Sequence, residues 1–477
     1  MLKKYLSDLA FMQLLNLLIK PVWILVIDRA VQNALPKSVY GNYFALFNFS
    51  IMFFIILDLG LNGFSTTQVA RDNRKIASLA GSIIGLKILL SFVYVLVVFT
   101  VGFVMGYSSQ EFSILLLLCC LQIFTSFNQY FRTIVASLQK FKWDGVFMVL
   151  DRVIIITLCA FLIWGNIPGF KLSIINFIWV QIIGIGAVFL TLIVFLFEHL
   201  RHLKISFNIS KLVPLMKKSW PFAVLVALMG LYNNIDSVML KTLVSDAEAG
   251  EYALGFRLYF ALLMFAQIFS GVLLPFFSKN MTDKPTIELV ASYTSKLLMW
   301  IGLTAACLSF AYQTEIMDLL YPSKSSVQAA QAFSILMFGF VGSVLILVYG
   351  ALLTARLSLK ELNIAAGITL SINLLFNAVF IPKYGASGAA FTTLVSQLLF
   401  GVICYFLCFK KFNFVWVKTE LFKQILGVCL LFVVIIFAKQ YFNNLVVHLG
   451  VITLTIILVA YLFKLFQASQ LKSLLRK

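Results

Sequence analysis

The sequence predicts an all-α polytopic membrane protein with about fourteen transmembrane helices. Of its 477 residues, 62% are hydrophobic and 12% are charged, a balance outside the range of soluble globular domains. Continuous apolar runs of about 20 residues recur along the chain, which is the length of helix that crosses a hydrocarbon core of roughly 30 Å. A transmembrane β-barrel is not favoured, because its strands would alternate between apolar and polar residues.

The apolar runs define the predicted spans in chain order. Polar and turn-forming residues separate each run from the next. The predicted spans are 10–31, 40–64, 77–106, 112–137, 145–165, 174–197, 219–243, 252–277, 291–312, 331–357, 361–381, 385–409, 421–439 and 446–466.

Basic residues gather in alternate loops. One side takes clusters such as Arg71, Arg74 and Lys75, whereas the other side carries isolated lysines such as Lys37 together with acidic residues such as Glu111. Because cytoplasmic loops are enriched in Lys and Arg, we expect both termini in the cytoplasm and the chain in the cell inner (plasma) membrane. The same rule explains the formal net charge of +19, so nucleic acid is not an expected partner.

A short internal repeat indicates how the spans are organised. The second span opens with VYGNYFALFNF and the eighth with EAGEYALGFRL, which align Gly41 with Gly250. We expect two six-helix lobes related by a pseudo-two-fold axis along the membrane normal, an arrangement in which one half can rock against the other. The predicted parts are an N-terminal lobe, a basic cytoplasmic linker, a C-terminal lobe, and two additional helices with a cytoplasmic tail: 1–200, 201–218, 219–410 and 411–477.

No stretch has the pattern of an enzyme or a metal site. The seven cysteines lie inside apolar runs, and the spacing of the three histidines matches no ligand set. The predicted outer loops are too short to house a catalytic domain. We therefore expect no catalytic residue, no metal and no cofactor, and a membrane enzyme such as a sugar polymerase or ligase is disfavoured.

Three cations of the first predicted lobe lie deep in their spans. At 1.5 Å per residue, Lys20 and Lys87 lie about 15 Å into the membrane and Arg152 about 10 Å. Ionisable residues at such depths tend to face a bundle interior or an aqueous cavity. We interpret Lys20, Lys87 and Arg152 as the binding residues of a cationic cavity for an anion such as a phosphate. The alternative is that each cation only neutralises an interior carboxylate.

Other charged residues are candidates for ion coupling or gating. Around the first helix, a step of 100° per residue puts Asp28 about 80° from Lys20, so Asp28 can border the same cavity. Pro21 removes a backbone hydrogen bond beside Lys20 and is expected to loosen the helix. Arg132 and Lys241 lie near span ends and are expected to snorkel to the interface. The coupling or gating candidates are Asp28, Asp151, Asp236 and Arg257, of which the last two lie at similar depth and are expected to pair.

Several stretches resemble a known family. KPVWILVIDRAVQN in the first span, YGNYFALFNFSIMFFIILDLGL in the second, NNIDSVML in the seventh and IPKYGASGAAFTTLVSQ at the eleventh and twelfth resemble the Wzx-type O-antigen flippase and polysaccharide-export family. This family belongs to the multidrug/oligosaccharidyl-lipid/polysaccharide exporter superfamily. The resemblance extends over essentially the whole chain.

The resemblance implies a flippase that moves undecaprenyl-diphosphate-linked oligosaccharide, an O-antigen or capsule repeat unit, across the inner membrane by alternating access. It also implies coupling to an H+ or Na+ gradient, contact with membrane lipids, and the polymerase and chain-length proteins of polysaccharide synthesis as partners. A lipid II flippase has the same span number and a cationic cavity, and remains an alternative. A drug or cation antiporter of the same superfamily is a second alternative, although it typically has twelve spans and favours an anionic cavity.

Overall fold

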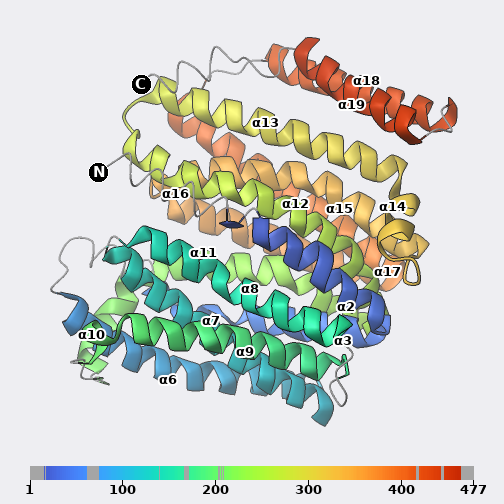
Figure 1. Cartoon of the computed structure of the whole chain (residues 1–477). Helices are drawn as coiled ribbons and strands as arrows, with labels where there is room; N and C mark the ends of the chain where they lie inside the picture. Colours follow the sequence, from blue (N-terminus) through green and yellow to red (C-terminus); the bar gives the residue numbers. More distant parts are fainter. Residues whose placement is uncertain are drawn as a thin grey trace. The chain divides into compact units, whose positions relative to one another are not determined.

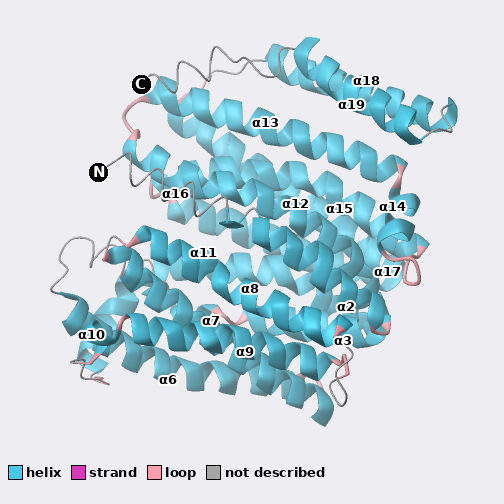
Figure 2. Cartoon of the chain, viewed as in Figure 1, coloured by secondary structure: helices cyan, strands magenta, loops and turns pink. Residues whose placement is uncertain are grey.

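The computed structural model describes residues 15–16, 18–61, 75–138, 140–165, 171–201, 205, 207, 209–414, 418–441 and 445–462. All regular elements among these residues are helices, and no strand occurs there (Figure 2). The chain is therefore an all-α polytopic membrane protein, as predicted. The predicted cytoplasmic location of the termini involves residues 1–14 and 463–477, which lie outside the described residues.

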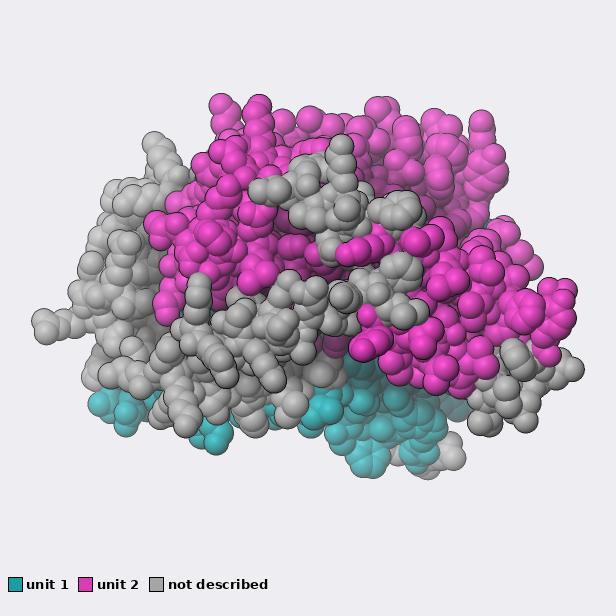
Figure 3. Space-filling view, turned by 90° about the horizontal axis from the view of Figure 1, so that it is seen from above, with its two compact units in different colours: residues 1–253 teal, residues 254–477 magenta. Residues whose placement is uncertain are grey.

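The chain forms two compact units, Met1–Ala253 and Leu254–Lys477, which Figure 3 distinguishes by colour. These units are defined by contacts within the chain, whereas the predicted lobes are defined by the repeat. The predicted domain boundaries remain predictions.

The first unit consists of short helices at its start followed by long apolar ones (Figure 1). It ends within the first two turns of α12, a helix that spans Asp246–Lys279. The preceding elements are η1 (Trp23–Asp28), α2 (Arg29–Ala34), α3 (Lys37–Met52), α4 (Ile55–Asp58), α6 (Lys75–Val104), α7 (Ser109–Ser137), α8 (Phe141–Trp164), α9 (Ile174–Phe195), α10 (Phe197–Leu200) and α11 (Ile209–Leu243).

Local sequence signals set several helix ends in this unit. The hydroxyl of Ser108 accepts from the backbone N–H of Glu111, and the Glu111 carboxylate accepts from the N–H of Ser108, which is a capping box. Ser173 caps α9 in a similar way. α4 ends where Leu59 and Gly60 adopt φ values of 44° and 78°, a left-handed turn that stops a helix.

Apolar side chains hold the long helices of the first unit together. One core cluster is formed by buried residues that include Leu86, Phe131, Phe147 and Val188, from α6, α7, α8 and α9 respectively. α3 packs along α11, and α7 packs along α9. These contacts position the helices that carry the charged residues considered below.

The second unit has the same all-helical construction. After the rest of α12 come α13 (Lys284–Ala311), α14 (Gln313–Leu320), α15 (Val327–Leu345), η2 (Ile346–Gly350), α16 (Ala351–Ala355), α17 (Leu359–Phe412), α18 (Lys418–Tyr441) and α19 (Leu445–Leu462). α15 and α17 make close backbone contact, since a Cβ atom added to Gly342 would lie 2.4 Å from the carbonyl of Gln397. Hydrophobic residues of α18 and α19, such as Leu431 and Ile452, pack against Trp300 of α13.

Ten helices among the described residues are long and apolar enough to cross a membrane, and α18 and α19 each contain a shorter apolar segment. The predicted spans 361–381 and 385–409 both fall in the element α17, which consists of two helices joined across a kink. The kink lies at Gly385, whose φ of 54° and ψ of −132° are not helical. Glycine tolerates this conformation because it lacks a Cβ atom.

Candidate functional site

The structure brings two of the three predicted binding cations together. Lys20, in the helical segment that precedes η1, lies close enough to Arg152 and Asp151 of α8 to interact with their charges. Arg152 contacts Asp151 at 3.9 Å, and their side chains are 33% and 23% exposed. The guanidinium of Arg152 also lies 5.4 Å from the ring centroid of Trp23, a cation–π distance. The Arg152 guanidinium is thus partly exposed and does not bind its carboxylate neighbour closely.

Arg132 of α7 adds a third cation to this group. Its charge acts on Lys20, and its Nε donates to Asp144 Oδ1 of α8 at 2.7 Å. Lys20, Arg132 and Arg152 then face the carboxylates of Asp144 and Asp151, which leaves an excess of one positive charge. We call these five residues the cationic cluster. Such an excess beside partly exposed guanidinium groups is suited to a phosphate, which arginine binds with two parallel hydrogen bonds.

Lys87 lies in a different environment. Its side chain is 1% exposed, and its Nζ donates to the carbonyl of Leu57 at 3.0 Å and to Ser126 at 2.7 Å. Asp58 Oδ1 lies 3.5 Å away. The ammonium thus has two partners at the end of α4, Leu57 and Asp58, and one on α7, Ser126. A role of Lys87 in substrate binding remains a prediction. The contacts with Leu57, Ser126 and Asp58 offer a second explanation for its burial, namely that it holds these helices together.

Asp28 ends a π-helical turn, Trp23–Asp28, that begins two residues after Pro21. A π-helix holds more residues per turn than an α-helix, so the angle of about 80° expected between Lys20 and Asp28 does not apply. Asp28 is 1% exposed. It accepts hydrogen bonds from Tyr40 Oη, at 2.9 and 3.0 Å, and from Gln32 Nε2 at 3.1 Å. The residue is therefore buried with neutral donors around it.

The remaining gating candidates are distributed over both units. Asp151 belongs to the cationic cluster. Asp236 of α11 is 4% exposed and accepts from Tyr252 Oη at 3.3 Å. Arg257 lies in the second unit, and its pairing with Asp236 remains a prediction.

Neutral side chains form a buried polar network in the second unit. Tyr259 Oη accepts from Gln397 Nε2 at 2.8 Å and lies 2.7 Å from Ser343 Oγ. Asn373 donates to Ser396 at 3.1 Å. Among the described residues, no group of three or more His, Cys, Asp or Glu side chains is placed to hold a metal ion.

A family model described as polysaccharide biosynthesis protein matches residues 3–281 of this chain. The chain belongs to the polysaccharide biosynthesis protein family. The matched region contains every residue of the cationic cluster as well as Asp28, Lys87 and Asp236. A comparison with curated proteins gives no match.

Solved structures with the same fold are flippases and transporters. The lipid II flippase MurJ, in an inward closed conformation, is 16% identical, has a TM-score of 0.66, and matches over 96% of this chain and 98% of its own. An inward-facing multidrug resistance MATE family transporter is 13% identical, with a TM-score of 0.63 over 84% of this chain and 98% of its own. A MOP superfamily transporter from Pyrococcus furiosus is 12% identical, with a TM-score of 0.62 over 85% of this chain and 95% of its own. These likenesses show a membrane transporter fold.

Sequence reasoning selected Lys20 and Arg152 as binding residues, a role that remains a prediction, and did not place Arg132 beside them. Arg132 was expected to snorkel because it lies five residues before the end of α7 at Ser137. An available signal was Asp144, three residues after the start of α8, because two opposite charges near the ends of consecutive helices are placed to meet. The partners of Asp28 were missed because Gln32 and Tyr40 carry no charge.

Proposed function

We propose that this membrane protein is a flippase that moves an undecaprenyl-diphosphate-linked oligosaccharide, an O-antigen or capsule repeat unit, across the inner membrane by alternating access. The observation that carries the proposal is the cationic cluster, in a chain of the polysaccharide biosynthesis protein family. A diphosphate headgroup is anionic and the cluster has a positive excess. Burial in a low dielectric strengthens the attraction between them.

In this mechanism Lys20 and Arg152 bind the diphosphate while the lipid tail stays in the bilayer. Arg152 supplies planar, paired donors and Lys20 a mobile point charge. Asp144 and Asp151 orient the arginines and keep the net charge low enough for release. Lys87 joins this site only if its contacts with Leu57, Asp58 and Ser126 exchange during the cycle.

Lipid II flipping is the second candidate, because the MurJ structure matches 96% of this chain whereas the MATE transporter matches 84%. A drug or cation antiporter is less favoured, since a positive cluster repels cationic drugs. We propose coupling to an H+ or Na+ gradient, with Asp28 as the carboxylate that responds. The polymerase and chain-length proteins of the same pathway are the proposed partners, and both termini are proposed to be cytoplasmic.

Deletion of the gene in its own host separates the two flippase readings. For an oligosaccharide flippase, the host stays viable, loses surface polysaccharide, and accumulates the lipid-linked repeat unit on the inner leaflet. Reintroduction of the intact chain restores the surface polysaccharide. Lethal loss of peptidoglycan on deletion would contradict the proposal and favour lipid II as the substrate.

A further inference from the structure

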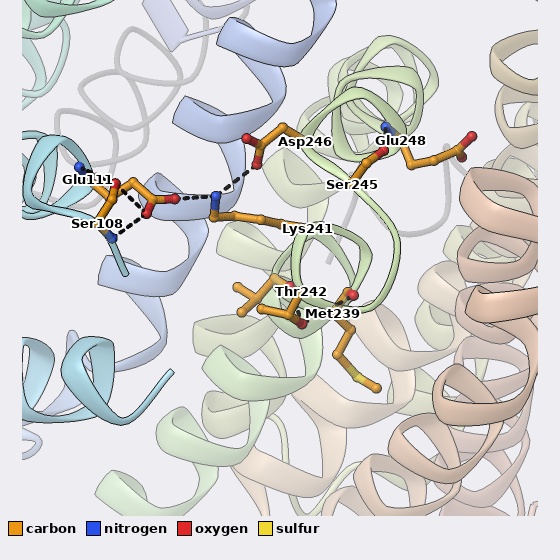
Figure 4. A network of polar contacts seen from close by, with 9 residues as sticks. Ser108, Glu111, Met239, Lys241, Thr242, Ser245, Asp246 and Glu248 are labelled. Carbon is orange, nitrogen blue, oxygen red and sulfur yellow. Dashed lines mark hydrogen bonds and ion pairs between the residues drawn. The ribbon is translucent and has the colours of Figure 1, made fainter. Parts of the chain in front are cut away.

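A second charged network joins the start of α7 to the turn between α11 and α12. Lys241, near the end of α11, forms ion pairs with Glu111 at the start of α7 and with Asp246 at the start of α12, the latter at 2.8 Å (Figure 4). The Lys241 side chain is only 9% exposed and that of Glu111 14%. The alternation of loop charges predicts that this end of the helices lies at the outer face of the membrane.

The contacts of this network divide into local and distant ones. Lys241 and Asp246 are five residues apart, on either side of the turn that joins α11 to α12, so their pair belongs to one helical hairpin. Lys241 and Glu111 are 130 residues apart. A further pair, Lys37 of α3 with Glu251 of α12, joins residues 214 apart. The α11–α12 hairpin is thus joined to α7 and α3 by one ion pair each.

The two carboxylate oxygens of Glu111 have different partners: one caps α7 and the other binds Lys241. Oε2 accepts from the N–H and hydroxyl of Ser108, at 2.7 and 2.8 Å, within the capping box of α7. Oε1 accepts from Lys241. If Lys241 leaves, Glu111 keeps its cap and Lys241 keeps Asp246. Breaking an ion pair is costly mainly when it leaves a buried charge without a partner, so this pair is built to open and close.

Tyr107 supports the closed arrangement. Its ring centroid lies 5.7 Å from Lys241 Nζ, within the range of a cation–π contact. Burial raises the pKa of the Tyr107 hydroxyl, and the carboxylates of Glu111 and Asp246 raise it further, so the ring stays neutral beside the ammonium.

From these contacts we infer that Lys241 is the latch of an outer gate: the α11–α12 hairpin closes the outer end of the first unit through the Lys241–Glu111 and Lys37–Glu251 pairs and moves away from α7 and α3 when that end opens. The inference rests on the proposed alternating-access function. Lys241, Glu111, Lys37 and Glu251 are the residues that stabilise the state closed at the outer end.

Accessibility of Ser237 tests the latch without any substrate. Ser237 lies on α11, is 1% exposed and accepts from Asn48 of α3 at 2.8 Å. In a Ser237→Cys background, a membrane-impermeant maleimide added from outside intact cells reports opening, with the parent chain as the background for its native cysteines. We expect Glu111→Lys to raise the labelling rate by roughly tenfold, the effect of about 1.4 kcal/mol on an equilibrium.

Matched variants separate the latch from folding and capping. Glu111→Gln retains a capping-box residue but removes the charge, and it should also raise labelling. Ser108→Ala weakens the cap and leaves the ion pair, so labelling should stay at the parent rate. Unchanged labelling in both Glu111→Lys and Glu111→Gln would overturn the latch, whereas failure to flip lipid with a normal labelling pattern would overturn the proposed function alone.

Discussion

Gly41 of α3 and Gly250 of α12 meet backbone to backbone. A Cβ atom on Gly41 would lie 1.9 Å from the carbonyl oxygen of Asp246 and 2.5 Å from the nitrogen of Gly250, and one on Gly250 would lie 2.4 Å from the carbonyl oxygen of Lys37. The two segments that the sequence relates as repeats therefore contact each other at the glycines that define the repeat. The contact lies beside the Lys37–Glu251 pair.

Substitution Gly41→Ala should weaken closure at this end. The clash is with backbone atoms, which cannot move aside as a flexible side chain can, and overpacking of this kind costs about 1–3 kcal/mol. We expect the maleimide to label Ser237→Cys faster in a chain that also carries Gly41→Ala than in the chain that carries Ser237→Cys alone. Gly186→Ala in α9 is the control, because nothing lies within 4 Å of its added Cβ atom. Equal labelling in both variants would show that the glycine contact does not hold the helices closed.

Removal of the Lys20 or Arg152 charge should weaken substrate binding. A hydrogen bond to a charged group contributes about 1.5–3 kcal/mol, so Lys20→Met and Arg152→Met should each raise the apparent Kd for a diphosphate lipid by roughly tenfold or more. Competition binding with purified protein measures this change. Lys279→Met, at an exposed position of α12, is the control. If Lys20→Met and Arg152→Met both bind the diphosphate lipid with the affinity of the parent chain, the cationic cluster is not the binding site.

Asp28→Asn tests the proposed coupling residue. Asparagine keeps one oxygen for Tyr40 and Gln32 but carries no negative charge, so it neither binds a cation strongly nor takes up a proton. Flipping by this variant should no longer respond to an imposed H+ or Na+ gradient. Tyr40→Phe, which removes a donor and leaves the carboxylate, should retain the response. A full gradient response in Asp28→Asn would assign coupling to another residue.

Lys87→Met distinguishes a packing role from a binding role. Methionine matches the length of the lysine stem but leaves the carbonyl of Leu57 and the Asp58 carboxylate without this donor. A hydrogen bond from a charged group contributes about 1.5–3 kcal/mol, so its loss should lower the temperature of thermal unfolding in detergent below that of Lys20→Met. If Lys87→Met unfolds at the temperature of the parent chain but no longer binds the diphosphate lipid, Lys87 is a substrate-binding residue.

The spans could be predicted from the sequence because burial in hydrocarbon requires long apolar runs, and such runs are visible without a structure. The predicted ranges 112–137 and 174–197 nearly coincide with α7 and α9. The break between the predicted spans 361–381 and 385–409 corresponds to the kink at Gly385 within α17. Trp23, at the start of the π-helical turn that ends at Asp28, stacks on Phe177 of α9, a contact between distant parts of the chain that no local pattern indicates.

The charged sites were less predictable because depth in a span does not give direction. Lys20 and Lys87 have similar predicted depth, but Lys20 lies near Arg152 whereas Lys87 binds the end of α4. Lys241 was expected to snorkel and is instead paired with two carboxylates. One of these, Glu111, is 130 residues away. Such pairings depend on which helices are neighbours, and only the structure supplies that.

The most direct test of the account is the rate at which purified protein moves a labelled undecaprenyl-diphosphate oligosaccharide across a vesicle membrane. We expect the parent chain and Lys279→Met to accelerate translocation over protein-free vesicles, and Lys20→Met with Arg152→Met to fall to roughly a tenth of that rate or less. Translocation by the parent chain at the rate of protein-free vesicles would contradict the account.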